Sequence, residues 1–218
     1  MKDYAVARRR MVREQLADAG ISDRRVLAAM EEVPRHLFVP KLLQHRAHQP
    51  SALPIGHGQT ISKPFTVGLM TSLLELRGHE HVLEVGTGSG YQAAILARLT
   101  RSVISVERIR PLAERSRVML AKLGVENINI LAHDGAEGVH DHAPFDAIMV
   151  TACASSVPAH LVSQLKDGGH LLIPISKGND QILYRYRRQG EEVTIEESVS
   201  CRFVPLLPGV TAEGEHRA

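Results

Sequence analysis

The chain has 218 residues, a length that suits one domain, and its hydrophobic fraction of 44% is ordinary for a globular protein. A net charge of only +2 argues against a strong field for nucleic acid or membranes, and two cysteines are too few for a disulfide framework, which favours a reducing cytoplasm. The apolar runs are too short to span a bilayer, and the N-terminus lacks the apolar core of a secretory signal, so neither membrane insertion nor secretion is expected.

The first quarter of the chain has a helical pattern. Residues 5–19 predict one helix, and Asp23 is a suitable N-cap for a second helix that ends near Val33. A proline-punctuated segment follows, and then a small polar loop, GHGQTISKP, at residues 56–64. The next run, PFTVGLMTSLLEL, has apolar residues at helical spacing, and its first proline fits a first helical turn.

From residue 81 onward, short apolar runs alternate with helical patterns. HVLEVG, SVISVE, INILAHD, FDAIMVTA and HLLIPI predict strands, whereas YQAAILARL and PLAERSRVMLAKLG predict helices. Such alternation predicts a parallel sheet covered on both faces. QILYRYRR and VTIEESVSCRFVPL flank QGEE and predict a C-terminal antiparallel hairpin.

The predicted fold class is therefore a doubly wound, Rossmann-like α/β domain. We expect an N-terminal helical extension over residues 1–55 and the main domain over 56–210, together forming one compact unit. The polar tail, residues 211–218, is expected to be disordered.

The most informative local motif is LEVGTGSGY, residues 83–91. Gly86, Gly88 and Gly90 fall between a predicted strand and a predicted helix, where glycine permits a tight turn and close approach of a ligand to the backbone. The spacing differs from the dinucleotide fingerprint, because Tyr91 stands where a third small residue would pack. A plain tight turn has a similar pattern, so the motif alone leaves both interpretations open.

Acidic residues strengthen the ligand interpretation. Glu107 ends the next predicted strand, about 20 residues after the first glycine, where a carboxylate can hydrogen-bond a ribose diol. Glu84 is a poor neighbour for a pyrophosphate and suits the cationic part of a ligand. Asp134 and Gly135 end the third strand and either meet an adenine amino group or form a turn that closes the strand. A nucleoside with an ammonium and a sulfonium group, S-adenosylmethionine, fits this set.

With these residues in place, the chain resembles the bacterial protein-L-isoaspartate O-methyltransferases. The resemblance extends from about Met11 to Leu206 and includes VPRHLFVP, LPIGHGQTISKP, VLEVGTGSGYQAAILA, FDAIMVTAC, LKDGGHLLIPI and RFVPL. GQTIS followed by proline is much more specific to this family than the glycine loop. The departures are small: Lys63 separates Ser62 from the proline, and Cys153 stands in a segment that is often richer in alanine.

The resemblance implies a methyltransferase fold that binds S-adenosyl-L-methionine, releases S-adenosyl-L-homocysteine and uses no metal. It makes Ser62 the active-site serine. It implies substrate contacts from the polar loop and from RFVPL, at Gln59, Thr60, Ile61, Val204 and Leu206. The cofactor residues, including Glu84 from the argument above, are Glu84, Gly86, Thr87, Gly88, Ser89, Gly90, Glu107, Asp134 and Gly135.

The implied activity is methyl transfer to the free α-carboxylate of L-isoaspartyl residues in damaged proteins and peptides, which leads through a succinimide to aspartate. Such a carboxylate has a pKa of roughly 3.3 to 3.7 and is already an anion at neutral pH. The reaction therefore needs positioning and exclusion of water rather than a general base. A loop of neutral hydroxyl and amide groups can hold the carboxylate without pairing it so strongly that it stops reacting.

Other interpretations stay open. The chain could methylate another carboxylate, a small molecule or nucleic acid, although it lacks an N-P-P-Y acceptor motif and only 4% of its residues are aromatic. A non-catalytic nucleotide-binding module is a third possibility. Ser62 precedes a predicted helix, so it could be an N-cap as well as a substrate contact.

The remaining expectations concern partners and metals. HEH at 79–81 and HDH at 140–142 look like metal-ligand pairs, but solvated loops explain them better because no cysteine or carboxylate set completes a site. The expected partners are isoaspartyl-containing proteins and peptides, not nucleic acid or membranes. The expected state is a cytoplasmic monomer.

Overall fold

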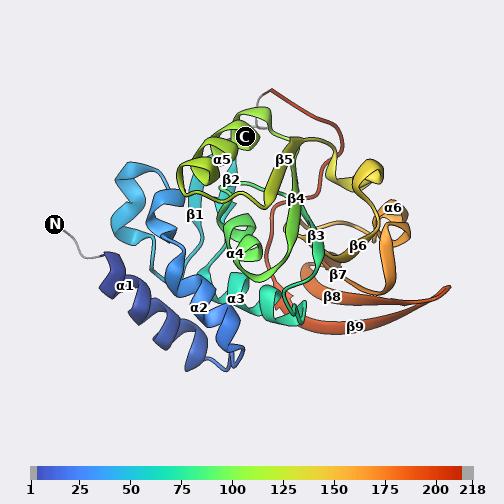
Figure 1. Ribbon diagram of the computed structural model, residues 1–218, viewed down its shortest axis with the longest axis horizontal. Coiled ribbons are helices and arrows are strands. Elements are labelled where there is room, and N and C mark those ends of the chain that lie inside the picture. Colours follow the sequence, from blue (N-terminus) through green and yellow to red (C-terminus); the bar gives the residue numbers. More distant parts are fainter. Residues whose placement is uncertain (1–3, 213–218) are drawn as a thin grey trace.

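The computed structural model describes residues 4–212, in which a central sheet is flanked by helices (Figure 1). The α-helices are α1 (Tyr4–Met11), α2 (Arg24–Glu32), α3 (Pro64–Leu73), α4 (Tyr91–Leu99), α5 (Arg110–Lys122) and α6 (Ala159–Ser163). The other helical segments are a π-helix, η1 (Val12–Ala17), and the 3-10 helices η2 (Arg35–Phe38), η3 (Lys41–Arg46), η4 (Gly135–Glu137) and η5 (His140–His142). The strands are β1 (Leu53–Gly56), β2 (Gln59–Ile61), β3 (His81–Val85), β4 (Ser102–Glu107), β5 (Ile128–Ala132), β6 (Phe145–Val150), β7 (Leu165–Lys177), β8 (Asp180–Gln189) and β9 (Glu192–Cys201).

The central sheet has seven strands in the order β5-β4-β3-β6-β7-β8-β9. The strands from β5 to β7 are parallel, and β8 and β9 are added in antiparallel fashion. The chain moves outward from β3 through β4 to β5 and then returns to place β6 beside β3. This order confirms the predicted doubly wound fold with its C-terminal hairpin, and it creates a switch point between β3 and β6, where ligands bind in such sheets.

Both faces of the sheet are buried. Val82 and Val103 point into a large core that includes residues of the N-terminal helices and of α3, α4 and α5. Their strand neighbours Leu83 and Ile104 point into a second core, which includes Leu161 of α6. Because each strand is covered on both sides, it has a continuous apolar sequence rather than an alternating one.

The N-terminal helices belong to the same core as the sheet. Asp23 caps α2 as predicted, since its carboxylate accepts hydrogen bonds from the backbone N–H groups of Arg25 and Val26. Met11 and Met30 are completely enclosed and belong to the larger core. None of the helices within residues 4–212 has the length and apolar character needed to cross a membrane.

The polar segment at 56–64 forms part of a β-hairpin rather than a plain loop. Leu53 pairs with Ile61 and Pro54 with Thr60 across β1 and β2, so the expected boundary between residues 55 and 56 falls inside this hairpin. The turn contains His57, whose φ of 55° is in the left-handed region. The strands are too short for their alternation to be recognised in the sequence.

The helix after the hairpin begins at Pro64, as predicted, but its N-cap is Lys63. Lys63 makes no side-chain capping hydrogen bond. The interpretation of Ser62 as the cap is therefore wrong, because Ser62 lies one residue too early.

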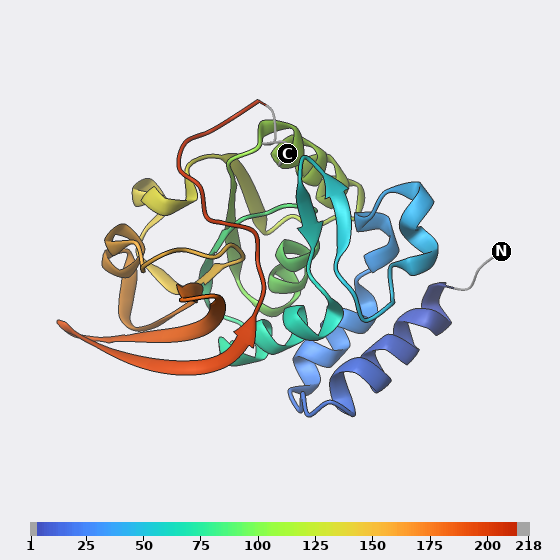
Figure 2. The ribbon, with the colours of Figure 1, turned by 180° about the vertical axis from the view of Figure 1, so that it is seen from behind.

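After β9 the chain continues as an extended segment, which we call the C-terminal strap (residues 202–212). Figure 2 shows the strap passing alongside the β1–β2 hairpin. Two isolated bridges hold it to the body, one between Pro205 and Cys153 and one between Thr211 and Ile109. Thr211, placed in the expected disordered tail, is thus hydrogen-bonded, and residues 213–218 of that tail lie outside the described part of the chain.

Candidate active site

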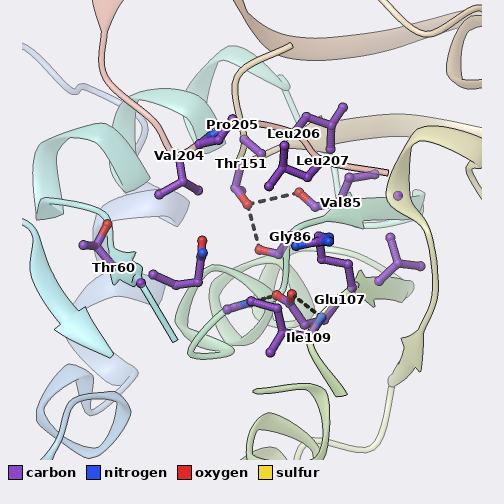
Figure 3. Close-up of a pocket in the computed structure, with 17 residues that line it drawn as sticks. Thr60, Val85, Gly86, Glu107, Ile109, Thr151, Val204, Pro205, Leu206 and Leu207 are labelled. Atoms are coloured by element: carbon purple, nitrogen blue, oxygen red, sulfur yellow. Dashed lines mark hydrogen bonds between the residues drawn. The ribbon is translucent and has the colours of Figure 1, made fainter. Parts of the chain in front are cut away.

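A cavity opens at the switch point, at the carboxyl ends of the parallel strands (Figure 3). Its lining comes from the ends of β3 to β6 on one side, and from the hairpin turn and the strap on the other. The sequence-predicted site residues that line it are Gln59, Thr60, Gly86, Gly88, Glu107, Gly135, Val204 and Leu206.

The glycine loop makes the tight turn that its sequence predicts. The φ angles of Gly86, Gly88 and Gly90 are 99°, 53° and 85°. A Cβ atom on Gly86 would collide with Oγ1 of Thr151, so this glycine is required by a protein contact alone. Gly88 is different: its nearest side-chain neighbour would be Cδ1 of Ile55 at 3.5 Å, so glycine here keeps the loop open towards the cavity.

Glu107 is fixed beneath this loop. One carboxylate oxygen accepts a hydrogen bond from the N–H of Gly88 at 2.8 Å, and the other accepts from the N–H of Ile109 at 2.9 Å. The residue is only 6% exposed, and burial raises the pKa of its carboxyl group against the opposing effect of these backbone bonds. The carboxylate is thus pre-oriented on the cavity wall.

Glu84 does not agree with the expectation that it faces a cationic part of the ligand. It is 0% exposed and does not line the cavity. Its Oε2 accepts a hydrogen bond from the hydroxyl of Ser105, which lies 2.5 Å from Oγ1 of Thr87. Burial raises the pKa of Glu84 to about 8, so at neutral pH it is mainly an uncharged support beneath the loop.

Asp134 also lies outside the cavity lining, whereas Gly135 contributes to it. The two carboxylate oxygens of Asp134 accept hydrogen bonds from the N–H groups of Ala136 and Gly209. Of the two interpretations of the Asp134-Gly135 pair, this geometry favours a turn for Asp134. Its bond to Gly209 also ties the strap to the end of β5.

Two further spaces continue from the cavity. A small junction is lined by Ile61, Ser62, Thr87 and Ser89, among others. It leads to an open groove between the start of α3 and the segment that follows β9. The volume is about 130 Å³ in the cavity and about 560 Å³ in the groove, so the groove is the larger of the two spaces.

Ser62 stands where the junction meets the groove. Its side chain is partly exposed, and within residues 4–212 its hydroxyl makes no hydrogen bond, whereas its carbonyl accepts one from Arg35 at 2.7 Å. Val204 of the strap separates the cavity from the groove, since it lines both.

The sequence interpretation missed Thr151. Its hydroxyl lies 3.0 Å from the carbonyl oxygen of Val85 and 2.7 Å from that of Gly86, and the residue lines the cavity, the junction and the groove. The available signal was its position directly after the FDAIMV strand, at the carboxyl edge of the sheet.

The lining of the site is suited to binding a ligand rather than to proton transfer. Among the described residues that line the cavity and the junction, the titratable side chains are Glu107, Arg108 and Tyr91. Within residues 4–212, no group of three or more His, Cys, Asp or Glu side chains is arranged to hold a metal ion. Such a site suits a reactant that arrives already ionised.

Comparisons with known proteins agree with this geometry. The model of the protein-L-isoaspartate(D-aspartate) O-methyltransferase family matches residues 7–211. The chain is 51% identical to protein-L-isoaspartate O-methyltransferase 2 of Geotalea uraniireducens, over 99% of this chain and 100% of that protein. It is 52% identical to the enzyme of that name from Geobacter metallireducens, over 94% of this chain and 95% of that protein.

Two solved structures are similar over nearly the whole chain. One, a protein-L-isoaspartate O-methyltransferase, has a TM-score of 0.82 at 27% identity and covers 94% of this chain and 67% of its own. The other is a candidate protein-L-isoaspartate O-methyltransferase from Plasmodium falciparum in complex with S-adenosyl-L-homocysteine. It has a TM-score of 0.81 at 26% identity and covers 92% of this chain and 98% of its own.

The uncharged state of Glu84 predicts a pH-dependent stability. Between its ordinary pKa of 4.5 and the folded pKa of about 8, the unfolded chain is ionised and the native chain is protonated. Unfolding then releases a proton, so the free energy of unfolding falls as pH rises, by at most about 1.4 kcal/mol per pH unit. Glu84→Gln removes this contribution, so the variant should be more stable than wild type at pH 7.5, with the difference shrinking towards pH 5.

Urea unfolding at several pH values measures this effect. Glu192→Gln on the exposed strand β9 is the matched control and should follow wild type. Parallel stability curves for wild type and Glu84→Gln would show that Glu84 is ionised in the folded protein.

Proposed function

Because the chain belongs to the protein-L-isoaspartate(D-aspartate) O-methyltransferase family, we propose that the cavity holds its methyl donor and the groove its damaged peptide. The protein is a repair methyltransferase that methylates the free α-carboxylate of L-isoaspartyl residues, from which a succinimide and then aspartate form. Its cofactor is S-adenosyl-L-methionine. The observation that carries the assignment of the site is the continuous space from the glycine loop, past Ser62, to the groove.

The cavity fits an adenosyl group by its shape and its donors. Gly88 leaves the backbone open to a ligand, and Glu107 offers an acceptor carboxylate for a ribose diol. We assign the glycine loop, Glu107 and Gly135 to the cofactor. When bound, S-adenosyl-L-methionine supplies a methyl group on a sulfonium cation.

The chain's own residues then have to hold one anionic oxygen in line and keep water out. Thr60 and Ser62 both offer neutral side chains in the lining of the junction, and a neutral donor orients a carboxylate without neutralising its charge. Val204 closes the wall between the cavity and the groove. No residue has to remove a proton, in agreement with the titratable groups that line these spaces.

The proposal also covers the oligomeric state, the cellular compartment and the partners of the enzyme. We propose that it acts as a monomer in the cytoplasm and does not bind nucleic acid. The small net charge of +2 and the low aromatic content of 4% support the last of these points, the absence of nucleic-acid binding.

Selectivity between matched peptides tests the function directly. An isoaspartyl peptide and its aspartyl counterpart carry the same charge, so selection must come from the path of the backbone and the position of the carboxylate. We expect kcat/KM to be at least about 100-fold higher for the isoaspartyl peptide. Comparable kcat/KM values for the two peptides would contradict the assigned function.

Ser62→Ala separates substrate contact from structure, because Lys63 and not Ser62 is the helix cap. The variant should keep the wild-type melting temperature and lose about 10- to 100-fold in kcat/KM, the value of one hydrogen bond to a charged group. Ser198→Ala on exposed β9 is the control. Wild-type kinetics of Ser62→Ala would remove this hydroxyl from the site.

Glu107→Ala should weaken binding of S-adenosyl-L-homocysteine, measured by calorimetry, by about 10- to 100-fold, since hydrogen bonds to an ionised acceptor would be lost. The melting temperature should fall too, because the N–H groups of Gly88 and Ile109 lose their acceptors. Glu126→Ala on the surface is the control. If the affinity for the nucleoside is unchanged while the protein is less stable, Glu107 serves the loop alone.

A further inference from the structure

Arg35 is a positive charge held completely inside the protein. It lies in η2 of the N-terminal region and is 0% exposed. Its Nε donates a hydrogen bond to the carbonyl of Ala47, and its Nη2 donates one to the carbonyl of Ser62, both at 2.7 Å. Its guanidinium also lies 4.7 Å from the centre of the Tyr91 ring. Arginine stays protonated in proteins, even where burial lowers its pKa as it does here.

No carboxylate within residues 4–212 balances this charge. Burial lowers the pKa of Arg35 and the nearby Tyr91 phenol raises it, and no carboxylate contributes to the shift. Its Nη1 has no hydrogen-bond partner in the described part of the chain. An unpaired charge removed from water is costly, so a partner from outside the chain would explain why the protein keeps it there.

The position of Arg35 indicates what that partner is. Ser62 and Tyr91, the two residues that it contacts on this side, both line the junction between the cavity and the groove. Arg35 itself lies behind that wall. An anion that reaches Ser62 therefore enters the field of an uncompensated cation across a buried layer, where the effective dielectric constant is low and charges act strongly.

We propose that Arg35 is the positioning residue that selects an ionised carboxylate at the transfer point. It fixes the backbone of Ser62 by a hydrogen bond and supplies the positive potential in which the substrate's α-carboxylate is held. This inference rests on the proposed function, which places that carboxylate beside Ser62. Arg35 acts through Ser62 and across the junction wall, without touching the substrate.

The charge change during transfer defines the kinetic effect. The carboxylate becomes a neutral ester, so its oxygen carries less negative charge in the transition state than in the bound substrate. A cation behind it stabilises the bound substrate at least as much as the transition state. Loss of the charge should therefore raise KM for the peptide without lowering kcat.

The test compares an isoaspartyl peptide with its α-carboxamide, which has the same shape and no charge. Both are titrated calorimetrically into protein saturated with S-adenosyl-L-homocysteine. We expect wild type to prefer the acid by about tenfold or more. Arg35→Met should reduce this preference to about twofold and raise KM about tenfold, with the affinity for S-adenosyl-L-homocysteine unchanged. Arg35→Lys keeps the charge and should keep most of the preference.

Lys41→Gln, which removes an exposed cation from the same region, is the matched control and should behave as wild type. An Arg35→Met protein that binds S-adenosyl-L-homocysteine and still prefers the acid tenfold overturns the proposal. So does a variant in which kcat falls and KM stays constant.

If Arg35→Met does not fold, the salt dependence of the wild-type preference for the acid over the carboxamide tests the proposal instead. Buried charges are screened much less than exposed ones, so a preference that persists in high salt supports Arg35. A preference that salt abolishes belongs to the exposed cations of the groove, Lys63 and Arg202, and overturns the proposal. Absence of methylation of any isoaspartyl peptide by wild type would refute the proposed function, whereas normal methylation with an unchanged acid preference in Arg35→Met refutes the inference alone.

Discussion

The site depends on one contact between the ends of two neighbouring strands. The hydroxyl of Thr151, just after β6, lies against the carbonyl oxygens of Val85 and Gly86, at the end of β3. This contact is made at the switch point, and it leaves no room for a side chain on Gly86. The loop must therefore turn away at once, and the cavity exists because of that turn. Thr151 lines the cavity, the junction and the groove, so the same contact sets their common wall.

The acidic residues around this contact have different roles, which depend on whether the side chain faces the cavity or is buried. Glu107 faces the cavity with both oxygens held by backbone N–H groups, and Glu84, two residues before Gly86, is buried against Ser105. Asp134 ties the strap to the end of β5. Burial raises the pKa of Glu84 to about 8, so an acid so close to the loop adds little negative charge at neutral pH. The positive charge of Arg35 is likewise not balanced by a carboxylate of the described chain.

The fold could be predicted because strand and helix patterns alternate over long segments, whereas side-chain direction could not. In a sheet buried on both faces the apolar residues do not alternate along a strand, so nothing in HVLEV shows that Glu84 points away from the cavity. The β1–β2 hairpin has strands too short for a visible alternation, and Pro64 at the first helical position moved the cap to Lys63. Arg35 contacts Ser62, and Thr151 contacts Gly86. Each pair is far apart in sequence, so no local sequence pattern indicates the contact.

The junction between the cavity and the groove is small, about 50 Å³, and its lining includes Phe203 of the strap and Thr66 of α3. Under the proposed function, the substrate carboxylate approaches this junction through the groove, which favours a peptide segment that is free to extend along it. A damaged residue inside an intact helix or sheet of a client protein would then have to leave that structure before it is methylated. Local unfolding of the client would thus set which lesions are repaired, alongside the chemistry of the altered bond.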